Sequence, residues 1–310
     1  MTSTEGFVHP ALLYRGAGDY LAGTVPFIQA GLAAGEPVMV AVPGQNLAQI
    51  RSALGADSGR VQLHDMSVAG RNPGRILPAV LLAFAAAHPQ QRVRIVGEPI
   101  WAGRTEVEYP ACAQHEALIN AAFADRAATI LCPYDLTSLD QNAVDDAYRT
   151  HPVLLTATER WDSPHYDDPF AVAATFNLPL PPAPSDAATI AIELKTLGEV
   201  RHLVSALATG YGMTADRIVD LVIAVNEVAS NTVEHTLNTG TLAVWRENGT
   251  MVCQLNDSGH IADPLAGRLP VPPDIPEGGR GLVMVNYLCD LVRIHTGPDG
   301  TTIRLHMHLA

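Results

Sequence analysis

The sequence is poor in basic residues and has no long apolar run. Its 310 residues include 19 lysines and arginines against 32 aspartates and glutamates, which gives a formal net charge of −13. This acidic balance argues against general nucleic-acid binding, because nucleic-acid phosphates attract basic surfaces. No apolar run approaches the roughly 18 residues that a transmembrane helix needs. The chain is therefore not expected to bind DNA or enter a membrane, although an acidic surface could meet a basic protein partner.

Cysteines are also few, and they are widely spaced at Cys112, Cys132, Cys253 and Cys289. The opening residues Met-Thr-Ser-Thr-Glu have neither the basic segment nor the apolar segment of a secretory signal. In a protein without a leader, such cysteines are expected to be reduced thiols. The sequence thus predicts a cytoplasmic location.

The first half of the chain lacks the motifs that hold phosphates. It has no Gly-x-x-x-x-Gly-Lys-Ser/Thr pattern, and Gly16-Ala-Gly18 is not followed by the third glycine of a dinucleotide-binding turn. At 47%, the apolar content is ample for two cores, and the length predicts about two domains. We therefore expect nucleotide binding, if present, to lie in the second half.

Residues 5–160 alternate short apolar runs with helical patterns. The runs 37–42, 61–64, 93–96 and 128–132 have strand length and are apolar on both faces. This pattern predicts a mostly parallel α/β sheet. Ligands of such sheets bind at the carboxyl ends of the strands, which here carry Pro43-Gly44, His64-Asp65, Gly97-Glu98-Pro99-Trp101 and Cys132-Pro-Tyr-Asp135.

Two sharper hypotheses compete with simple packing in this half. Cys112 and His115 share a helix face, and Cys132 and His151 could join them as metal ligands if the fold brought all four together. His115-Glu116-Ala-Leu also has a faint likeness to the phosphoacceptor site of a sensor histidine kinase. Buried thiols are usually inert core residues, and the arginine and proline usual after such a histidine are missing, so packing is the favoured interpretation.

A proline-rich stretch, 161–186, predicts a linker to a second domain at 187–310. In that domain the strand pattern 240–247 is joined to 250–256 by Asn248-Gly249, a strong hairpin signal. A second hairpin is expected across Gly297-Pro-Asp-Gly300. Antiparallel strands with helices on one face give a two-layer α/β sandwich.

One helix of this domain carries both an apolar and a polar stripe. Its apolar stripe consists of Leu221, Val222, Val225, Val228, Ala229, Thr232 and Val233. Glu227, Asn231 and His235 follow one another at intervals of four and share a second face. An asparagine oxygen suits a hard cation such as Mg²⁺, and a glutamate can accept a proton from a hydroxyl. The alternative is a surface helix whose polar residues are solvated.

Three motifs follow this helix in order. A strand ends in Asp257-Ser258-Gly259, Gly278-Gly279-Arg280-Gly281-Leu282 opens another helix, and Gly300-Thr301-Thr302 begins a closing strand. In this order the four motifs resemble the GHKL (histidine kinase-like) ATPase superfamily over residues 187–309. The helix Glu-x-x-x-Asn-x-x-x-His is similar to that of its anti-sigma-factor serine kinases. The resemblance implies the Bergerat ATPase fold.

The resemblance also implies ATP and Mg²⁺ as cofactors and a role for each motif residue. Glu227 would be the catalytic base, Asn231 the Mg²⁺ ligand, and Asp257 the acceptor for the adenine amino group. The remaining implied nucleotide contacts are Gly259, Gly279, Arg280, Gly281, Leu282 and Thr302. Two alternatives stay open, since Asp257 could be an ordinary turn residue and Arg280 a solvated one. The family often has a further glycine where this sequence has Ile261, which is a departure at the start of the loop over the nucleotide.

The first half resembles the MEDS sensory domain. The similarity lies in His9 with Tyr14, in Gly31-Leu-Ala-Ala-Gly-Glu-Pro37, in Cys132-x-Tyr-Asp135 and in Arg149-Thr-His151-Pro152. It implies a RecA-like α/β fold that binds a small-molecule or partner signal, with His9 and Cys132 as ligand contacts.

Together the two resemblances imply a protein serine/threonine kinase that regulates transcription by partner switching. Its partners would be a sigma factor and an anti-anti-sigma antagonist that carries the phosphorylated serine, and a homodimer is also implied. Two other classes remain: a nucleotide-binding module that sequesters a partner without catalysis, and an atypical sensor histidine kinase. The missing phosphoacceptor helix argues against the latter.

Overall fold

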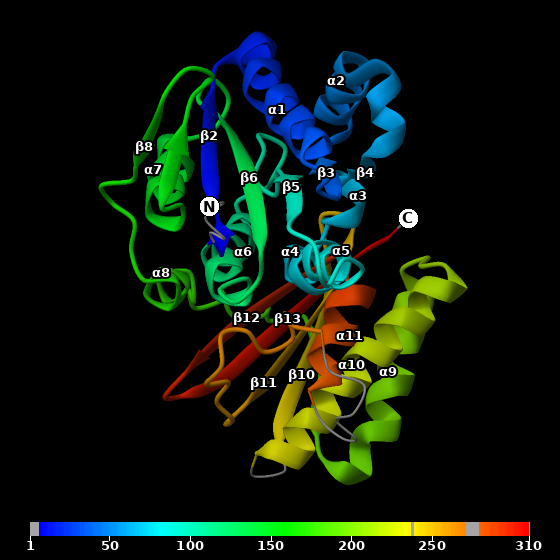
Figure 1. The fold of residues 1–310 in the computed structure, drawn as a ribbon. Coiled ribbons are helices and arrows are strands. Elements are labelled where there is room, and N and C mark those ends of the chain that lie inside the picture. The colour runs from blue at the N-terminus through cyan, green and yellow to red at the C-terminus, as the bar shows by residue number, and fades with distance from the viewer. Residues whose placement is uncertain (1–5, 237–238, 271–278, 310) are drawn as a thin grey trace. The chain divides into compact units, whose positions relative to one another are not determined.

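The structure is a computed structural model that describes residues 6–236, 239–270 and 279–309. The chain divides into two units, Met1–Phe176 and Asn177–Ala310 (Figure 1). This boundary differs from the predicted one, because the start of the expected linker 161–186 is folded into the first unit. There β8 (Arg160–Asp162) pairs with β7 (Val153–Leu155), and α8 (Pro169–Thr175) packs against α6 (Tyr109–Ala122).

The first unit contains the predicted sheet of mostly parallel strands. The strand order is β4-β3-β5-β6-β2-β7-β8, and only the β7–β8 pair is antiparallel. The remaining strands are β1 (Phe7–Val8), β2 (Pro10–Tyr14), β3 (Val38–Val42), β4 (Gln62–Asp65), β5 (Val93–Gly97) and β6 (Ala128–Asp135). Strands β2 and β3 are buried along their whole length, as expected for a sheet covered by helices on both faces.

Helices connect these strands. Besides α6 and α8 they are α1 (Gly16–Ala33), α2 (Gly44–Leu54), α3 (Met66–Ala69), α4 (Pro73–Arg75), α5 (Leu82–Ala86) and α7 (Gln141–Thr150). A 3₁₀ segment η1 (Gly55–Arg60) follows α2. Residues 73–86 are not one regular helix but a composite of α4, a π-helical segment η2 (Ile76–Leu81) and α5. Pro78 lies within η2, and a proline removes a backbone donor from the regular helical pattern.

Strands β1 and β2 share one register along β6 but are interrupted at His9. Phe7 lies opposite Ala128 and Ala11 lies opposite Cys132, so the offset is the same on both sides of the break. The interruption follows from Pro10, which has no backbone N–H to donate to the ladder. His9 is thus placed beside the middle of the central strand β6.

The second unit is the predicted two-layer sandwich. Its antiparallel sheet has the order β12-β13-β11-β10-β9, formed by β9 (Ala188–Ile192), β10 (Gly240–Glu247), β11 (Thr250–Asp257), β12 (Leu291–Gly297) and β13 (Gly300–His308). The helices α9 (Leu197–Gly210), α10 (Ala215–His235) and α11 (Arg280–Leu288) lie on one face of it (Figure 1), and a 3₁₀ turn η3 (Leu194–Thr196) precedes α9. One apolar core joins the helices to the sheet.

The long helices α1 and α10 both include polar residues. Even α10, which at 21 residues is longer than α1 at 18, carries polar residues along one face. Within the part of the chain that the structure describes, no helix is both long enough and apolar enough to cross a membrane.

Two glycines in the hairpin turns of the second unit have positive φ for different reasons. Gly249 has φ 75° beside Asn248 at 46°, as a two-residue hairpin turn requires, and a Cβ added there would meet nothing within 4 Å. Gly300 has φ 124°, and an added Cβ would lie 2.2 Å from the carbonyl oxygen of Asp257. The backbone at the end of β11 therefore needs a residue without a side chain at position 300.

These two glycines form a matched pair for a stability test. Gly249→Ala is expected to cost about 1–2 kcal/mol of unfolding free energy, the usual cost of left-handed backbone for an L-residue. Gly300→Ala should cost clearly more, because its Cβ also collides with backbone. Chemical denaturation gives the free energies, and hydrogen exchange along β11 and β13 locates the effect. Equal costs at the two positions would contradict the close approach to Asp257.

Candidate functional site

Helix α10 positions the polar residues that the sequence singled out. Its buried side faces the core of the second unit and consists of Leu221, Ala224, Val225, Val228, Ala229, Thr232 and Val233. Thr214 occupies the N-cap position of the helix, and its side chain makes no capping hydrogen bond. Glu227 and Asn231 are half-buried on a different face, and His235 is exposed at the helix end. The helical period alone brings these three residues into line.

Asp257, at the end of β11, is fixed through both of its carboxylate oxygens. The Thr232 hydroxyl donates to Oδ2 at 2.7 Å, and the Gly259 backbone N–H donates to Oδ1 at 2.8 Å. Each carboxylate oxygen can accept more than one hydrogen bond, so the group keeps acceptor capacity for a ligand. A Cβ on Gly259 would lie 3.0 Å from Oδ1 of Asp257, so the backbone passes close to the carboxylate.

The start of α11 lies against Glu227 and Asn231. Gly279 caps the helix with φ 77°, a conformation that glycine adopts without strain. A Cβ on Gly281 would lie 3.0 Å from Glu227 Oε2 and 3.4 Å from the side-chain nitrogen of Asn231. The helix N-terminus, with its free N–H groups, is therefore brought next to a carboxylate and a carboxamide. Gly278 of the same motif lies outside the described residues.

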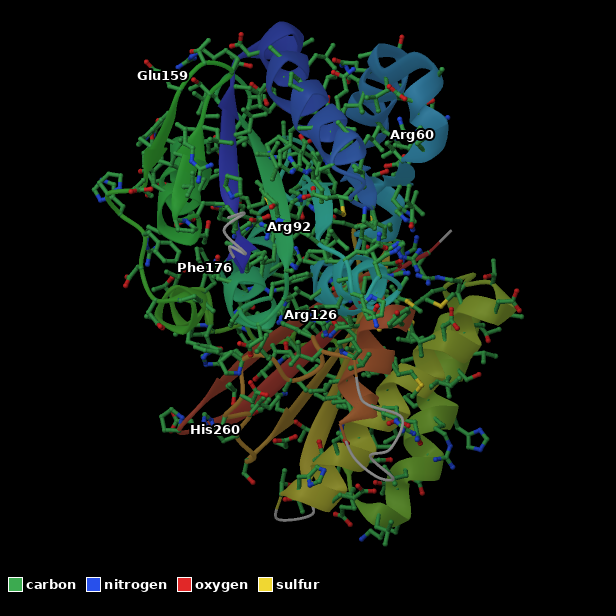
Figure 2. All side chains as sticks on the ribbon, viewed as in Figure 1. Arg60, Arg92, Arg126, Glu159, Phe176 and His260 are labelled. Carbon is green, nitrogen blue, oxygen red and sulfur yellow. The ribbon has the colours of Figure 1, made fainter. Side chains whose placement is uncertain are left out.

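These elements surround a cavity of ≈ 660 Å³. Of the residues predicted to contact a nucleotide, it is lined by Asn231, Asp257, Gly259, Gly279, Gly281 and Leu282. Its apolar lining includes Val228, Ile261, Leu265, Leu269 and Ile303. The exposed His260, labelled in Figure 2, also belongs to the lining. The volume and the mixture of apolar walls with a few fixed polar groups are typical of a small-molecule site.

Three predicted residues are placed outside that lining. Glu227 touches its edge through Gly281, and Arg280 is exposed at the start of α11. The Thr302 hydroxyl donates to Asn256 Oδ1 at 2.8 Å, away from the cavity, whereas its neighbour Thr301 lines the cavity and donates to the Gly259 carbonyl at 2.8 Å. Since successive strand residues point to opposite faces, the geometry favours Thr301 over Thr302 for a contact with the nucleotide.

Sequence reasoning also missed Thr232 and the effect of Ile261. Thr232 was assigned to the apolar stripe, yet its hydroxyl orients Asp257. Ile261 stands where related sequences often have glycine. Its side chain packs against the core, and its N–H donates to Thr296 Oγ1 at 3.0 Å, so the segment after Asp257 is tied to β12. The available signal for Thr232 was a hydroxyl residue directly after Asn231 within the apolar stripe.

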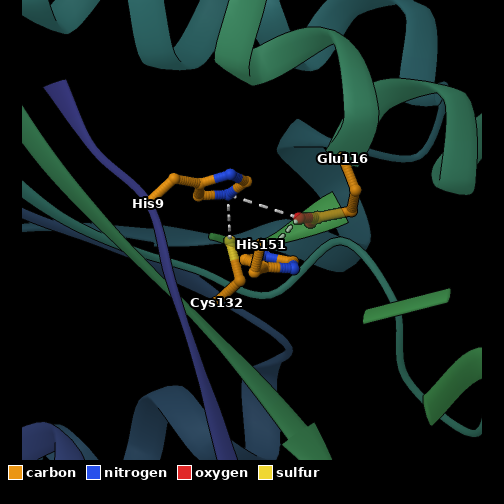
Figure 3. A group of neighbouring side chains, drawn as sticks. All are labelled: His9, Glu116, Cys132 and His151. Atoms are coloured by element: carbon orange, nitrogen blue, oxygen red, sulfur yellow. Dashed lines mark hydrogen bonds and ion pairs between the residues drawn. The ribbon is translucent and has the colours of Figure 1, made fainter. Parts of the chain in front are cut away.

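In the first unit, His9 and Cys132 are buried and lie together. Their closest atoms, His9 Nε2 and Cys132 Sγ, are 3.4 Å apart, in a group that also contains Glu116 and His151 (Figure 3). Of the four residues considered as metal ligands from the sequence, Cys132 and His151 belong to this group and Cys112 and His115 do not. Glu116 was not foreseen as a partner, and its only signal was an acidic residue within a largely apolar helix.

A separate cavity of ≈ 450 Å³ lies at the carboxyl ends of β2, β3, β5 and β6. The residues lining it include Tyr14, Asn46, Glu98, Trp101 and Asp135. Glu98 is 2% exposed and accepts hydrogen bonds from the Asn46 amide at 2.9 Å and the Tyr20 hydroxyl at 3.3 Å. Burial raises the pKa of Glu98 from 4.5 to about 8, so this carboxyl is mostly neutral at pH 7.

Comparison with known proteins assigns a family to each unit. The MEDS family, described as the MEthanogen/methylotroph, DcmR Sensory domain, matches residues 8–152, and the histidine kinase-like ATPase domain matches residues 190–307. Both predicted resemblances are thereby confirmed. Among solved structures, the RsbU and RsbW domains of Rv1364c from Mycobacterium tuberculosis share 23% identity with this chain at a TM-score of 0.31. That match covers 41% of this chain and 33% of the other, and it carries no argument about the fold.

Curated relatives match the second unit. Serine-protein kinase RsbW of Halalkalibacterium halodurans is 32% identical over 118 residues, which are 34% of this chain and 72% of the relative. Serine-protein kinase RsbW of Bacillus licheniformis is 31% identical over 122 residues, 35% of this chain and 76% of the relative. The chain therefore belongs to the family of the RsbW serine-protein kinases, and it carries a MEDS domain ahead of its histidine kinase-like ATPase domain.

Proposed function

We propose that the chain is an ATP- and Mg²⁺-dependent regulatory serine kinase of the anti-sigma-factor type, which controls transcription by partner switching. The observation that carries this proposal is the ≈ 660 Å³ cavity, where one helix face, one strand end and one helix N-terminus converge. Its partners would be a sigma factor and an anti-anti-sigma antagonist whose serine is phosphorylated. The relatives' description as serine-protein kinases supports the transfer of phosphate to a serine, and a homodimer is the assembly that we propose with these partners.

The residues present fit a bound ATP. Asp257, held by Thr232 and Gly259, keeps acceptor capacity for the adenine amino group. The free N–H groups at the start of α11 suit phosphate oxygens, which helix N-termini attract. A side chain at Gly281 would fill the space between this helix and Glu227, so the glycine keeps that approach open.

Glu227 and Asn231 would have different roles in phosphate transfer. The Asn231 side-chain oxygen would hold Mg²⁺, which neutralises phosphate charge when bound. Glu227, one helical turn away, would accept the proton of the attacking serine hydroxyl. Because Glu227 meets the cavity only at its edge, it lies where a protein substrate could approach without displacing the nucleotide.

The first unit would supply signal sensing. Its ≈ 450 Å³ cavity lies at the edge of the parallel sheet where ligands of such sheets bind, and it presents a neutral carboxyl, tyrosines and Trp101. These groups suit a small molecule that combines an apolar body with one or two polar atoms. The domain's MEDS match supports a sensory role.

The adenine assignment predicts that Asp257→Asn weakens ATP binding by about 10- to 100-fold, the usual effect of losing a hydrogen bond to a charged group. Titration calorimetry of the full chain with Mg-ATP measures the affinity. Asp299→Asn, an exposed turn position of the same unit, is the control and should bind as the wild type does. An unchanged affinity in Asp257→Asn would remove the adenine assignment.

The division of roles predicts different outcomes for two neighbouring variants. Glu227→Ala should keep ATP affinity near that of the wild type and lower serine phosphorylation of the antagonist about 100- to 10,000-fold, as loss of a general base does. Asn231→Ala should lose both, because the metal ligand supports binding itself. Transfer from labelled ATP to the antagonist, together with a binding titration, measures the two effects.

Glu234→Ala, exposed on the same helix, controls for a general effect of removing a charge from α10. Phosphorylation by Glu227→Ala at the wild-type rate would overturn the base assignment. A wild type that binds ATP and its partner without ever transferring phosphate would instead support the sequestering module.

The raised pKa of Glu98 predicts a pH-dependent stability of the first unit. Below pH 4.5 the carboxyl is protonated in both the folded and the unfolded state. From there to about pH 8 only the unfolded state ionises, so folding stability falls as the pH rises. Glu98→Gln should flatten this fall, whereas Glu106→Gln, at an exposed loop position, should keep it. Thermal unfolding between pH 5 and 9 checks both, and parallel curves for wild type and Glu98→Gln would exclude a neutral buried Glu98.

A further inference from the structure

Four buried side chains from separate parts of the first unit point their polar atoms at one another (Figure 3). His9 stands at the break between β1 and β2, Glu116 on α6, Cys132 within β6, and His151 at the end of α7. One ligand atom from each lies within 4.8 Å of all the others. Residues so distant in sequence meet only because the fold brings them together.

The distances are close to those of a metal coordination shell. His9 Nε2 lies 3.4 Å from Cys132 Sγ and 3.5 Å from Glu116 Oε2, and His151 Nε2 lies 3.0 Å from the same oxygen. Around a tetrahedral Zn²⁺ with the usual bond lengths, neighbouring ligand atoms are about 3.3–3.7 Å apart. Only small side-chain movements would be needed to place an ion at the centre.

Outer hydrogen bonds fix which ring nitrogen of His9 faces the centre. Asn120 uses its amide nitrogen to donate to the Thr150 carbonyl at 2.8 Å, so its oxygen faces His9 Nδ1 at 3.1 Å. That oxygen only accepts, and Nδ1 must therefore carry the proton. His9 Nε2 consequently faces the centre of the group, 3.4 Å from Cys132 Sγ.

His151 is held in the same tautomer by a different partner. Its Nδ1 lies 2.9 Å from both the Ala147 carbonyl oxygen and Thr150 Oγ1. The Thr150 hydroxyl donates its proton to the Asp146 carbonyl at 2.9 Å, so both neighbours accept and Nδ1 is again the protonated nitrogen. Its Nε2 thus also faces the centre. A metal-bound histidine typically donates its second nitrogen to a carbonyl or amide oxygen in this way.

The atoms of His9, Glu116 and His151 that face one another are hydrogen-bond acceptors, and no positively charged group in the described part of the chain lies between them to balance the carboxylate of Glu116. Glu116 is 1% exposed, and its Oε2 lies 3.0 Å from His151 Nε2 without the angles of a hydrogen bond. Among the described residues, neither oxygen of Glu116 nor His151 Nε2 makes a hydrogen bond. A buried carboxylate facing two lone pairs is costly unless a cation or a proton lies between them. A coordinated metal would deprotonate the Cys132 thiol, and the resulting thiolate would add a negative charge to balance the ion.

We propose that His9, Glu116, Cys132 and His151 bind one divalent transition-metal ion of the Zn²⁺ type. Two imidazoles, a thiolate and a carboxylate form a mixed ligand set that suits Zn²⁺ and, as a spectroscopic substitute, Co²⁺. All four positions come from the protein and all four residues are buried, which is the arrangement of a closed structural site. The ion would tie β6 and the start of β2 to α6 and α7.

The test uses the full chain without a polyhistidine tag, purified and analysed for metal by mass spectrometry. One zinc per chain is expected. After exchange with Co²⁺, the wild type should show the visible bands of tetrahedral Co²⁺ and a near-ultraviolet thiolate-to-cobalt band. Cys132→Ser should lose the thiolate band, whereas Cys112→Ser, a buried cysteine of α6 outside the group, should keep it.

A second variant does not alter a ligand. Asn120→Ala removes the acceptor of His9 Nδ1 and should weaken Co²⁺ binding by about 10- to 100-fold, the usual effect of losing such an outer partner. The exposed Asn142→Ala on α7 should bind as the wild type does.

The alternative is a protonated imidazole paired with Glu116. In that case the wild-type chain would carry only traces of metal and develop no Co²⁺ bands at saturating Co²⁺, which overturns the proposal without reference to any variant. A thiolate band that persists in Cys132→Ser would overturn it equally, because another cysteine would then be the ligand.

Discussion

The second unit depends on a close approach of backbone segments around the carboxylate of Asp257. Gly300 lies against the carbonyl of Asp257, and Gly259 lies against the carboxylate of the same residue. Gly281 lies against Glu227 and Asn231. At each of these glycines an added Cβ would fit only if neighbouring atoms moved. Because protein interiors are close-packed, moving one of these segments would also displace the residues packed around it. The glycines of the motifs therefore act first by bringing strand ends and helix starts together, and a cavity with fixed polar groups is the consequence.

Much of this arrangement is predictable because it follows from local periodicity. The interval of four between Glu227 and Asn231 fixes a shared helix face, and Asn248-Gly249 fixes the hairpin that leads to Asp257. Which of Thr301 and Thr302 faces the cavity depends on the register of β13 against β11. A shift of this register by one residue would move each side chain of β13 to the opposite face of the sheet. Two adjacent threonines look alike in the sequence, so the pattern does not tell which of them faces the cavity.

The first unit was less predictable for a related reason. Short strands such as β1 and β7 have too few residues for a period to appear, and the helix α8 lies in a stretch whose prolines indicate a linker. Contacts between residues that are far apart in the sequence, such as Glu116 and His9, depend on the order of strands in the sheet. The chemistry of single residue types could suggest that histidine and cysteine bind something, but it could not identify the fourth partner.

Two buried carboxyl groups of the first unit differ because their neighbours differ. Glu98 accepts hydrogen bonds from a hydroxyl and an amide, which favour its ionised form, but the effect of burial is larger and raises its pKa to about 8. Glu116 faces ring nitrogens whose protons are turned away from it, and the proposed metal ion would lie between these groups. The central strands β2 and β6 run past both places. His9 and Cys132 lie along their course, and Tyr14 and Asp135, paired in register, lie at their carboxyl ends beside the cavity. The cavity and the buried group are thus both built on β2 and β6.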